Sequence, residues 1–411
     1  LICKRLINLI YNYDFYAKTA NKKNKDLIHK IILGHFLILN IEIKNKKIFS
    51  ITLEEYKAKL LLSIIYNLEL LETLNLLKQI ILNHIDENGF HKSYNALRHA
   101  NFINDLYEIR NMMLFFNIII PDELNFQILN MSSILKSLFH SDGSLALFNG
   151  ANNFYINIVS EISKKAEDLK IKDLSNSKKG IICYSDKNKK IFMDILKPLN
   201  ESINSRFHAG TLSFELSCLN EKIITNCGAQ NEQYSKNPEY LRYSAAHSTI
   251  ILNNTNISEL IKNHSYKRAP KNIVVNSFED RESVFWESSH DGYLKKYHKI
   301  IKRSLKISKK NNSISGQDEI ISTKINHNKG HYSIRFHLMP NCKCLLTNDK
   351  KTALIKTKLN QSWVFKANSN VCLEDSIYFG NGKRIEHNQQ IVIYGNIINT
   401  KKIENWSLTK S

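Results

Sequence analysis

The stretch SRFHAGTLSFELSCLNEKIITNCGAQNEQYSKNPEYLRYSAAHSTIILNN, residues 205–254, decides the fold of the larger part of this chain. Apolar and polar residues alternate in several of its short runs, which is typical of β-strands. His208 and His247 each lie at the mouth of such a strand. Because strands are rigid and their ends are open, polar side chains gathered there are a common way for a β scaffold to build a site.

The same pattern continues on both sides of this stretch, from about residue 175 onward. Polar turns separate the runs, and no long helix intervenes. Many short, regularly spaced strands predict a sandwich-like or barrel-like all-β domain. The predicted strands are 180–184, 190–195, 211–217, 222–227, 248–252, 283–287, 299–307, 313–320, 331–338, 353–356, 362–366 and 391–397.

Residues 1 to about 140 have a different pattern. No proline precedes Pro121, and apolar residues recur at spacings of three and four, as in Leu60, Leu61 and Ile64. This spacing predicts amphipathic helices, and short gaps between them predict antiparallel hairpins. Thr52 is a candidate helix start. The predicted helices lie near 25–40, 53–67, 70–85, 96–116, 122–140 and 153–169.

The boundary between the two patterns falls in the polar, charged run KIKDLSNSKKG, residues 170–180. We therefore predict a helical domain over residues 1–172 and a β domain over residues 178–411. The first residue is leucine, so we interpret the chain as a fragment or processed product whose helical domain is truncated at its N-terminus. Any targeting signal before that residue would not be visible.

Composition limits the class of protein. Hydrophobic residues make up 43% of the 411, enough for a large core. The longest apolar run, 31–43, is interrupted by Gly34, Asn40 and Glu42, so we expect no membrane span. The seven cysteines are odd in number and include no C-x-x-C pair, which favours neither a disulfide framework nor a cysteine zinc site.

The formal net charge of +20 has two interpretations. One is an anionic partner, such as an acidic polysaccharide or a nucleic acid. The other is a lysine-rich composition that coats every surface, and the even spread of the lysines favours it. No RNP-like motif, zinc knuckle or basic recognition helix is present, so we expect no nucleic-acid partner. The oligomeric state stays open.

The run from Arg206 to Leu252 resembles the C-terminal domain of the heparinase II/III-like family. In that family a His-x-His-x-Asp-x-Leu-Ser-Phe run opens a strand, a Val-Asp-x-Gly strand follows, and an Arg precedes an Ala-His-Asn-Thr strand. Further matching runs are WESSHDGY (286–293), IKRSLKI (301–307), GQDEI (316–320), IRFHLMP (334–340), DENGFHKSYNALRHANFINDLYEIR (86–110) and HSDGSLALFNGA (140–151).

This resemblance implies an α+β multidomain fold, with an incomplete (α/α) toroid of helical hairpins followed by an antiparallel β-sandwich. It also implies a polysaccharide lyase that cleaves an acidic, uronate-containing polysaccharide by β-elimination. The alternative is a catalytically impaired glycan-binding or envelope-associated protein on the same scaffold. The family suggests the cell envelope or periplasm, while the cytoplasm stays open because the start of the chain is missing.

The resemblance also implies a metal site. His208 matches the second His of the His-x-His run, His247 matches the His of the Ala-His strand, and Asn226 stands where the family often has Asp. In the resembled enzymes these groups hold a divalent metal, usually zinc, which ties strands together. Two imidazoles and an oxygen ligand suit zinc. The alternative is a hydrogen-bonded histidine pair that joins the strands without a metal.

Catalytic and substrate-binding roles are carried over in the same way. Arg206 replaces the first His of the family run; arginine can bind a carboxylate but cannot act as a base near neutral pH. Arg242 matches the Arg before Ala-His and could bind a sugar carboxylate or pair with Glu215 or Asp291. Tyr234 lies near the position of a lyase tyrosine. Its competitors are Tyr240 and Tyr243.

Further candidates come from outside the opening stretch. His91 could contact substrate or transfer a proton, and His290 could bind substrate. One departure from the family is in the helical part, where Ala96 falls at the position of a catalytic tyrosine. The loss of that hydroxyl, together with Arg206, is what keeps the non-catalytic alternative open. Nucleic-acid binding through the net charge ranks last.

Overall fold

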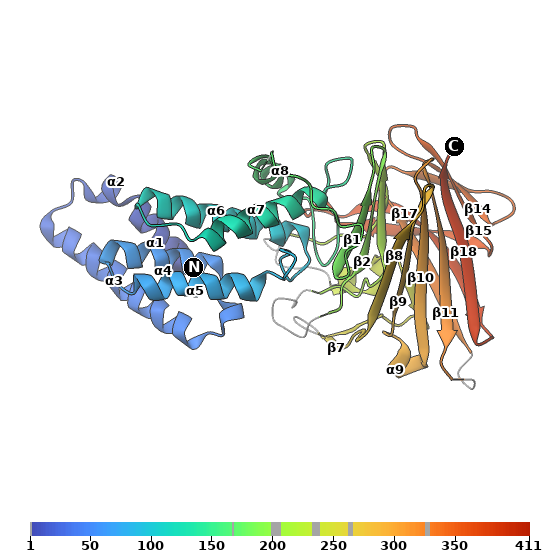
Figure 1. Ribbon diagram of the computed structural model, residues 1–411, viewed down its shortest axis with the longest axis horizontal. Helices are drawn as coiled ribbons and strands as arrows, with labels where there is room; N and C mark the ends of the chain where they lie inside the picture. Colours follow the sequence, from blue (N-terminus) through green and yellow to red (C-terminus); the bar gives the residue numbers. More distant parts are fainter. Residues whose placement is uncertain (1, 167, 199–206, 232–238, 262–265, 325–328) are drawn as a thin grey trace. The chain divides into compact units, whose positions relative to one another are not determined.

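The computed structural model describes residues 1–411 except 1, 167, 199–206, 232–238, 262–265 and 325–328 (Figure 1). The chain divides into two compact units. We call residues 1–92 and 99–132 the helical unit, and residues 93–98 and 133–411 the β unit. Arg206 and Tyr234, two of the predicted site residues, lie outside the described residues.

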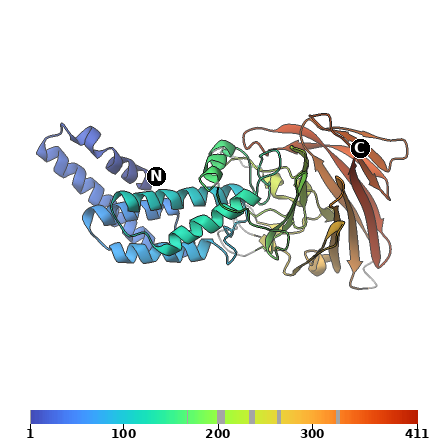
Figure 2. The same cartoon turned by 45° about the horizontal axis from the view of Figure 1, so that its top comes forward.

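The helical unit is built from antiparallel neighbours. Helix α1 packs on α3 and α4, and α4 packs on α5 (Figures 1 and 2). The helices are α1 Ile2–Tyr11, α2 Tyr13–Ala17, α3 Lys22–Asn45, α4 Leu53–Tyr66, α5 Leu70–His84, α6 Ala96–Phe115 and α7 Asp122–Ser137. Helix α6 begins, and α7 ends, in residues that belong to the β unit, which also contains α8 Ile156–Lys164.

Local sequence signals explain where α4 begins and ends. The Thr52 hydroxyl accepts a hydrogen bond from the main-chain N–H of Glu55 at 3.2 Å, and the Glu55 carboxylate accepts one from the main-chain N–H of Thr52 at 2.9 Å. This capping box satisfies two donors that the first helical turn would leave unpaired. Asn67 ends the helix in the left-handed conformation, with φ 53°. The predicted start at Thr52 is confirmed.

In the described residues of the β unit, the longer strands form two eight-stranded antiparallel sheets. In the first sheet the order is β1-β2-β3-β4-β12-β17-β16, with β5 paired to β12; in the second it is β13-β14-β15-β18-β11-β10-β9-β8. The first comprises β1 Gly180–Ser185, β2 Lys189–Ile195, β3 Phe214–Cys218, β4 Glu221–Thr225, β5 Ile250–Leu252, β12 Gly330–Leu338, β16 Val371–Tyr378 and β17 Glu386–Ile397.

The second sheet comprises β8 Ile273–Glu279, β9 Ser283–His290, β10 Lys299–Ser308, β11 Ser313–Ser322, β13 Lys343–Leu346, β14 Thr352–Lys356, β15 Ser362–Ala367 and β18 Lys401–Lys410. Two short strands, β6 Glu259–Leu260 and β7 Tyr266–Arg268, pair with each other, and the short helix α9 spans Leu294–Tyr297. Helices followed by antiparallel sheets confirm the predicted fold class at this level.

One hydrophobic core is shared by the two sheets. Phe214 of the first sheet stacks on Trp406 of the second, with ring centroids 5.4 Å apart. Phe336 of the first sheet lies 4.9 Å from Phe365 of the second. Because strand side chains alternate between faces, this places Phe214 and Leu216 in the core and turns Glu215 and Ser217 to the opposite face of the first sheet.

A buried ion pair of the second sheet lies in this core. Arg303 of β10 is 0% exposed and binds the carboxylate of Asp318 on β11 through Nε at 2.7 Å and Nη2 at 2.9 Å. Its Nη1 donates to the carbonyl oxygens of Leu212 at 2.9 Å and Ser248 at 2.8 Å. Arg303 therefore joins the second sheet to two segments next to strands β3 and β5 of the first.

The compact units divide the chain earlier than the predicted boundary at residues 172–178. Residues 133–172 belong to the β unit because they bond within it: Lys172 donates to the carbonyl of Ser133, and His140 bonds to Glu215 and Ser217. The boundary at 172–178 between a helical and a β domain stays a prediction; the last helix before it, α8, ends at Lys164, and the first strand begins at Gly180.

Four longer strands were not predicted: β8, β13, β16 and β18. Strands β8 and β13 each bury a single side chain, Val275 and Cys344, so they show no apolar alternation. In β16 and β18, polar groups at inward positions hide it. In β18 the buried residues include Glu404 beside Trp406 and Leu408, and in β16 they include Ser376. Among the described residues, none of the helices has the length and apolar character that crossing a membrane requires.

Replacing Arg303 should destabilise the β unit, because Asp318 would remain buried without its counter-charge. We expect Arg303→Met to lower the free energy of unfolding by about 3–5 kcal/mol. Chemical denaturation followed by tryptophan fluorescence measures this unit alone, since Trp286, Trp363 and Trp406 are the three tryptophans of the chain. Lys302→Met, which removes a half-exposed pair with Glu287, is the control and should cost less than about 1 kcal/mol. Equal effects of the two substitutions would contradict the role of Arg303.

Candidate functional site

The β unit brings His208 and His247 together. His208 lies in the segment before β3, and His247 follows the short 3-10 helix Ser244–Ala246, just before β5. Their ring centroids are 5.3 Å apart with planes at 70°, and both residues are buried. Gly210 makes this packing possible: a Cβ there would lie 2.9 Å from the His247 ring.

Both imidazoles are neutral at physiological pH. Burial lowers the pKa of His208 well below 6.5, and the neighbouring His247 and Arg242 lower it further. Burial also lowers the pKa of His247 to about 4. Within the described part of the chain, neither ring nitrogen of His247 has a hydrogen-bond partner, although both nitrogens are buried. Such neutral, buried imidazoles are poor proton acceptors near neutral pH.

Asn226, at the end of β4, reaches the same region from another side. Its side-chain Oδ1 accepts a hydrogen bond from the main-chain N–H of Ser248 at 3.0 Å, directly after His247. Its Nδ2 donates to Glu215 Oε1 at 3.3 Å, and its main-chain N–H donates to the same oxygen at 2.9 Å. The amide is therefore fixed by bonds on both sides.

The divalent metal that the resemblance implies stays a prediction, and these donors do not fit it well. Zinc sites in proteins use Cys, His, Asp and Glu, and no group of three or more such residues in the described part of the chain is arranged to hold a metal. The third predicted ligand, Asn226, is a neutral amide whose oxygen is already bonded to Ser248. Only the two imidazoles of the predicted set remain as donors.

Glu215 is the centre of a buried polar cluster on this face of the first sheet, formed with His140, Lys222, Thr225 and Asn226. Its Oε2 accepts hydrogen bonds from His140 Nε2 at 2.9 Å, from the main-chain N–H of Leu147 at 3.0 Å and from Lys222 Nζ at 3.3 Å. Its Oε1 accepts from Thr225 and Asn226. Burial alone would raise the pKa of Glu215, but Lys222, His140 and the Leu147 N–H lower it to about 2.

Two more histidines are held by specific partners. His140 bridges Glu215 and Ser217, each at 2.9 Å, and burial with Lys222 lowers its pKa to about 4 despite the Glu215 carboxylate. His337 of β12 lies 2.8 Å from the Ser376 hydroxyl and 2.9 Å from the carbonyl of Ala245, so its Nε2 donates. Burial lowers the pKa of His337 to about 3.

Arg242 lies beside His208, whereas His290 belongs to the second sheet. Arg242 is buried; its Nη1 bonds to Glu239 at 3.0 Å and its Nε to the carbonyl of Phe207 at 3.1 Å. Its two suggested partners bond elsewhere, since Glu215 binds Lys222 and Asp291 caps the turn at Lys271. His290 is buried in the second sheet, where its Nδ1 accepts from the Gly292 N–H at 3.1 Å.

His91 belongs to the helical unit and is 7% exposed. Its main-chain N–H donates to His99 Nδ1 at 3.2 Å, and its ring lies 5.2 Å from the ring of Phe102. Ala96 begins helix α6, so the position at which the family carries a tyrosine is a buried methyl group here.

Sequence reasoning did not single out Glu215, His140, Lys222 or His337 as a group. A signal was present in β3, whose run Phe-Glu-Leu-Ser-Cys is buried at every position, including Glu215 and Ser217. Charged residues are almost never fully buried unless paired. Burial of the polar face of a strand is a tertiary fact, and the partner His140 comes from a segment 75 residues away.

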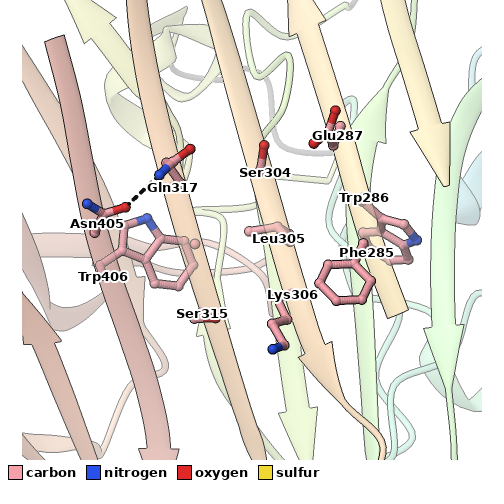
Figure 3. Close-up of a pocket in the computed structure, with 11 residues that line it drawn as sticks. Phe285, Trp286, Glu287, Ser304, Leu305, Lys306, Ser315, Gln317, Asn405 and Trp406 are labelled. Atoms are coloured by element: carbon pink, nitrogen blue, oxygen red, sulfur yellow. Dashed lines mark hydrogen bonds between the residues drawn. The ribbon is translucent and has the colours of Figure 1, made fainter. Parts of the chain in front are cut away.

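A recess lies on the outer face of the second sheet (Figure 3). Glu287, Ser304, Gln317 and Asn405 are cross-strand neighbours and form a row over β9, β10, β11 and β18. Gln317 Nε2 donates to Asn405 Oδ1 at 2.9 Å. Phe285, with Lys306 Nζ 5.5 Å from its ring centroid, borders the row. The recess has a volume of about 300 Å³.

Acid should weaken the buried polar group through His140. Since the pKa of His140 is about 4 in the folded state and 6.5 is its ordinary value, the unfolded chain binds more protons between these values. The contribution of His140 to the free energy of unfolding is therefore fully present above pH 6.5, and it is lost as the pH falls toward 4. We expect His140→Gln to flatten this loss in urea denaturations from pH 7.5 to 5. His331→Asn, at an exposed position, is the control and should leave the slope unchanged. A slope that His140→Gln does not alter would contradict this assignment.

Comparisons with known proteins agree on one family. The model of the heparinase II/III-like C-terminal domain matches residues 173–407, more than half of the chain. Among solved structures, heparan sulfate lyase HepC from Pedobacter heparinus has a TM-score of 0.72 at 12% identity, covering 100% of this chain and 67% of that chain. A crystal structure of heparinase III has a TM-score of 0.75 at 12% identity, with 100% and 68% covered.

A second heparinase III structure, of the BT4657 gene product, has a TM-score of 0.76 at 11% identity, with 100% of this chain and 67% of that chain covered. No curated protein matches the chain. At these identities the structures show a shared fold. Together with the family model, which spans His208, Asn226 and His247, they show that this chain belongs to the heparinase II/III-like family.

Proposed function

We propose that this protein is a polysaccharide lyase that cleaves an acidic, uronate-containing polysaccharide by β-elimination. The observation that carries the proposal is the family match over residues 173–407. The fold shared with a heparan sulfate lyase and with heparinase III over the whole chain supports it. The finer architecture belongs to the same proposal: the helical unit forms part of an (α/α) toroid, and the two sheets form the family's β-sandwich.

The reaction sets clear demands on the residues. A base removes the proton on C5 of the uronate, the electrons of that bond form the C4=C5 double bond, and the C4–O glycosidic bond breaks as an acid protonates the leaving oxygen. A cation beside the sugar carboxylate stabilises the carbanion-like transition state. The site therefore needs a carboxylate-binding group and groups that transfer protons.

We assign the carboxylate-binding role to Arg206 and Arg242. Arginine presents a planar fork of donors that matches a carboxylate and stays charged at every working pH. The bonds from Arg242 to Glu239 and to the Phe207 carbonyl support this role, because they hold the guanidinium in one orientation next to the chain segment that leads to Arg206. His290 remains a proposed substrate contact of lower rank.

Proton transfer is assigned to Tyr234, with His91 as a second candidate. The buried, neutral state of His208 and His247 argues against either as the base. Tyr240 and Tyr243, the competitors of Tyr234, are 46% and 41% exposed. With three tyrosines in this short stretch, a phenol is available to remove the C5 proton and to protonate the leaving oxygen. Arg206 and Ala96 stand where the family has other groups.

The activity and the tyrosine assignment are tested together. We expect the purified chain to release unsaturated uronate products, detected by ultraviolet absorbance, from one of alginate, heparan sulfate, hyaluronan or a bacterial exopolysaccharide. Tyr234→Phe should lower the rate about 10²–10⁴-fold because it removes the proton-transfer group. Tyr394→Phe, whose hydroxyl bonds to Glu374 on β16, is the control and should leave the rate unchanged.

Two results would count against these assignments. A loss of activity in Tyr240→Phe or Tyr243→Phe, with Tyr234→Phe unaffected, would move the proton-transfer role to another tyrosine. If the folded wild-type chain releases no unsaturated product from any of the four polymers, the lyase proposal is wrong.

A second candidate function is glycan binding without catalysis. The row of Glu287, Ser304, Gln317 and Asn405 favours it, because carboxylate, hydroxyl and amide groups are the donors and acceptors that bind sugar hydroxyls (Figure 3). Ala96 and Arg206 at family catalytic positions support it too. As for other members of the family, we propose the cell envelope or periplasm as the location and an acidic polysaccharide as the partner.

This alternative predicts a binding loss at the row. Gln317→Ala should weaken binding of an acidic oligosaccharide by about three- to tenfold, the range expected for one lost hydrogen bond. Isothermal titration calorimetry measures it, and Thr409→Ala, exposed on the same β18 outside the row, is the control. Unchanged affinity in both Gln317→Ala and Asn405→Ala would exclude this row as the glycan site.

A further inference from the structure

We propose that this chain needs no metal at the His208–His247 pair, because the Asn226 amide, held by Glu215, ties β4 to the His247 segment instead. The resembled enzymes achieve this tie with a divalent ion between two histidines and an acid. The inference rests on the geometry of the β unit and on membership of the family. It does not depend on the proposed lyase activity.

The hydrogen bonds of Asn226 already join β4 to the segment that carries His247. Oδ1 accepts from the Ser248 N–H, and both the main-chain N–H and Nδ2 donate to Glu215 Oε1. Ser248 adds a parallel link, since its hydroxyl donates to the carbonyl of Thr225 at 2.8 Å and accepts from the main-chain N–H of His337 at 3.0 Å. Strands β4 and β12 are thereby fastened to the residue that follows His247.

Binding a metal through Asn226 would require moving an amide whose orientation is set by these bonds. Turning its oxygen toward the imidazoles would leave the buried Ser248 N–H and one oxygen of Glu215 with fewer partners, and unpaired buried polar groups are costly. Glu215 cannot replace it as a ligand, because each of its two carboxylate oxygens already accepts three hydrogen bonds. Five residues supply these six donors.

The charges of the region also disfavour a divalent cation. Glu215 is balanced by Lys222, with Nζ 3.3 Å from Oε2, so its negative charge is already compensated inside the unit. Arg242, bonded to the carbonyl of Phe207, puts a second cation beside the residue next to His208. A metal there would have two neutral imidazoles and one neutral amide, with no anionic ligand among the predicted three.

The identity of residue 226 decides between the two arrangements. Asparagine can donate to the Glu215 carboxylate, whereas aspartate at the same place would put a second carboxylate about 3.3 Å from Oε1. Two buried carboxylates so close cannot both stay ionised without a cation between or beside them. Asn226→Asp should therefore create the need for a metal, with the imidazoles of His208 and His247 as the nearest ligands.

Metal content and thermal unfolding of the full chain test this directly. After dialysis against zinc and then against buffer, we expect the wild-type chain to retain no stoichiometric zinc by elemental analysis. Its Tm should not change with a chelator or with added zinc. Asn226→Asp should retain close to one zinc per chain, and zinc should raise its Tm by mass action. Neither readout involves activity.

Two controls separate a site from surface binding. Asn226→Asp combined with His247→Ala should lose both the retained zinc and the Tm shift. Asn405→Asp adds the same charge on the outer face of the second sheet and should gain neither. Stoichiometric zinc in the wild-type chain that His247→Ala removes would overturn the proposal, whether or not Asn226→Asp folds. The proposal is supported if the wild-type chain retains no zinc and its Tm is the same with and without the chelator.

Discussion

The buried guanidinium of Arg303 is the constraint on which the β unit depends. It lies in the core that the two sheets share, where an unpaired charge would be very costly. Asp318 balances it, and the carbonyls of Leu212 and Ser248 take further N–H groups. Since these carbonyls belong to the segments beside β3 and β5, one side chain sets where the chain that carries His247 can lie. The hydrogen bonds of Arg303 in the core thus limit where the segments next to the two histidines can lie.

The same rule operates a second time on the opposite face of the first sheet. Glu215 is charged and fully buried, and it is tolerable only because Lys222, His140 and main-chain N–H groups meet both of its oxygens. Burial in turn keeps the surrounding imidazoles neutral. This face therefore acts as a rigid, pre-paired support. Among the residues that the structure describes, Tyr240 and Tyr243 are far more exposed than these histidines.

Sequence reasoning placed most of the regular structure because period alone decides it. The alternation in 299–307 and 313–320 predicted two strands that the structure extends by one or two residues, and Thr52 predicted the start of α4. It missed β16 and β18, whose inward positions carry Ser376 and Glu404. Composition also cannot reveal that the segment around His140, which precedes the predicted boundary at 172–178, bonds into the first sheet.

The sequence by itself determined the order of helices before strands, the family motifs, and the presence of two histidines and an asparagine at the right intervals. Only the tertiary structure decided what those residues do to one another. Which way the Asn226 amide points depends on Glu215, and Glu215 stays ionised because Lys222 and His140 fold onto it. Periodicity is a local property that a strand or helix carries alone. Hydrogen-bond partners and the charge of a buried group depend on segments far apart in the chain, and these meet only in the folded protein.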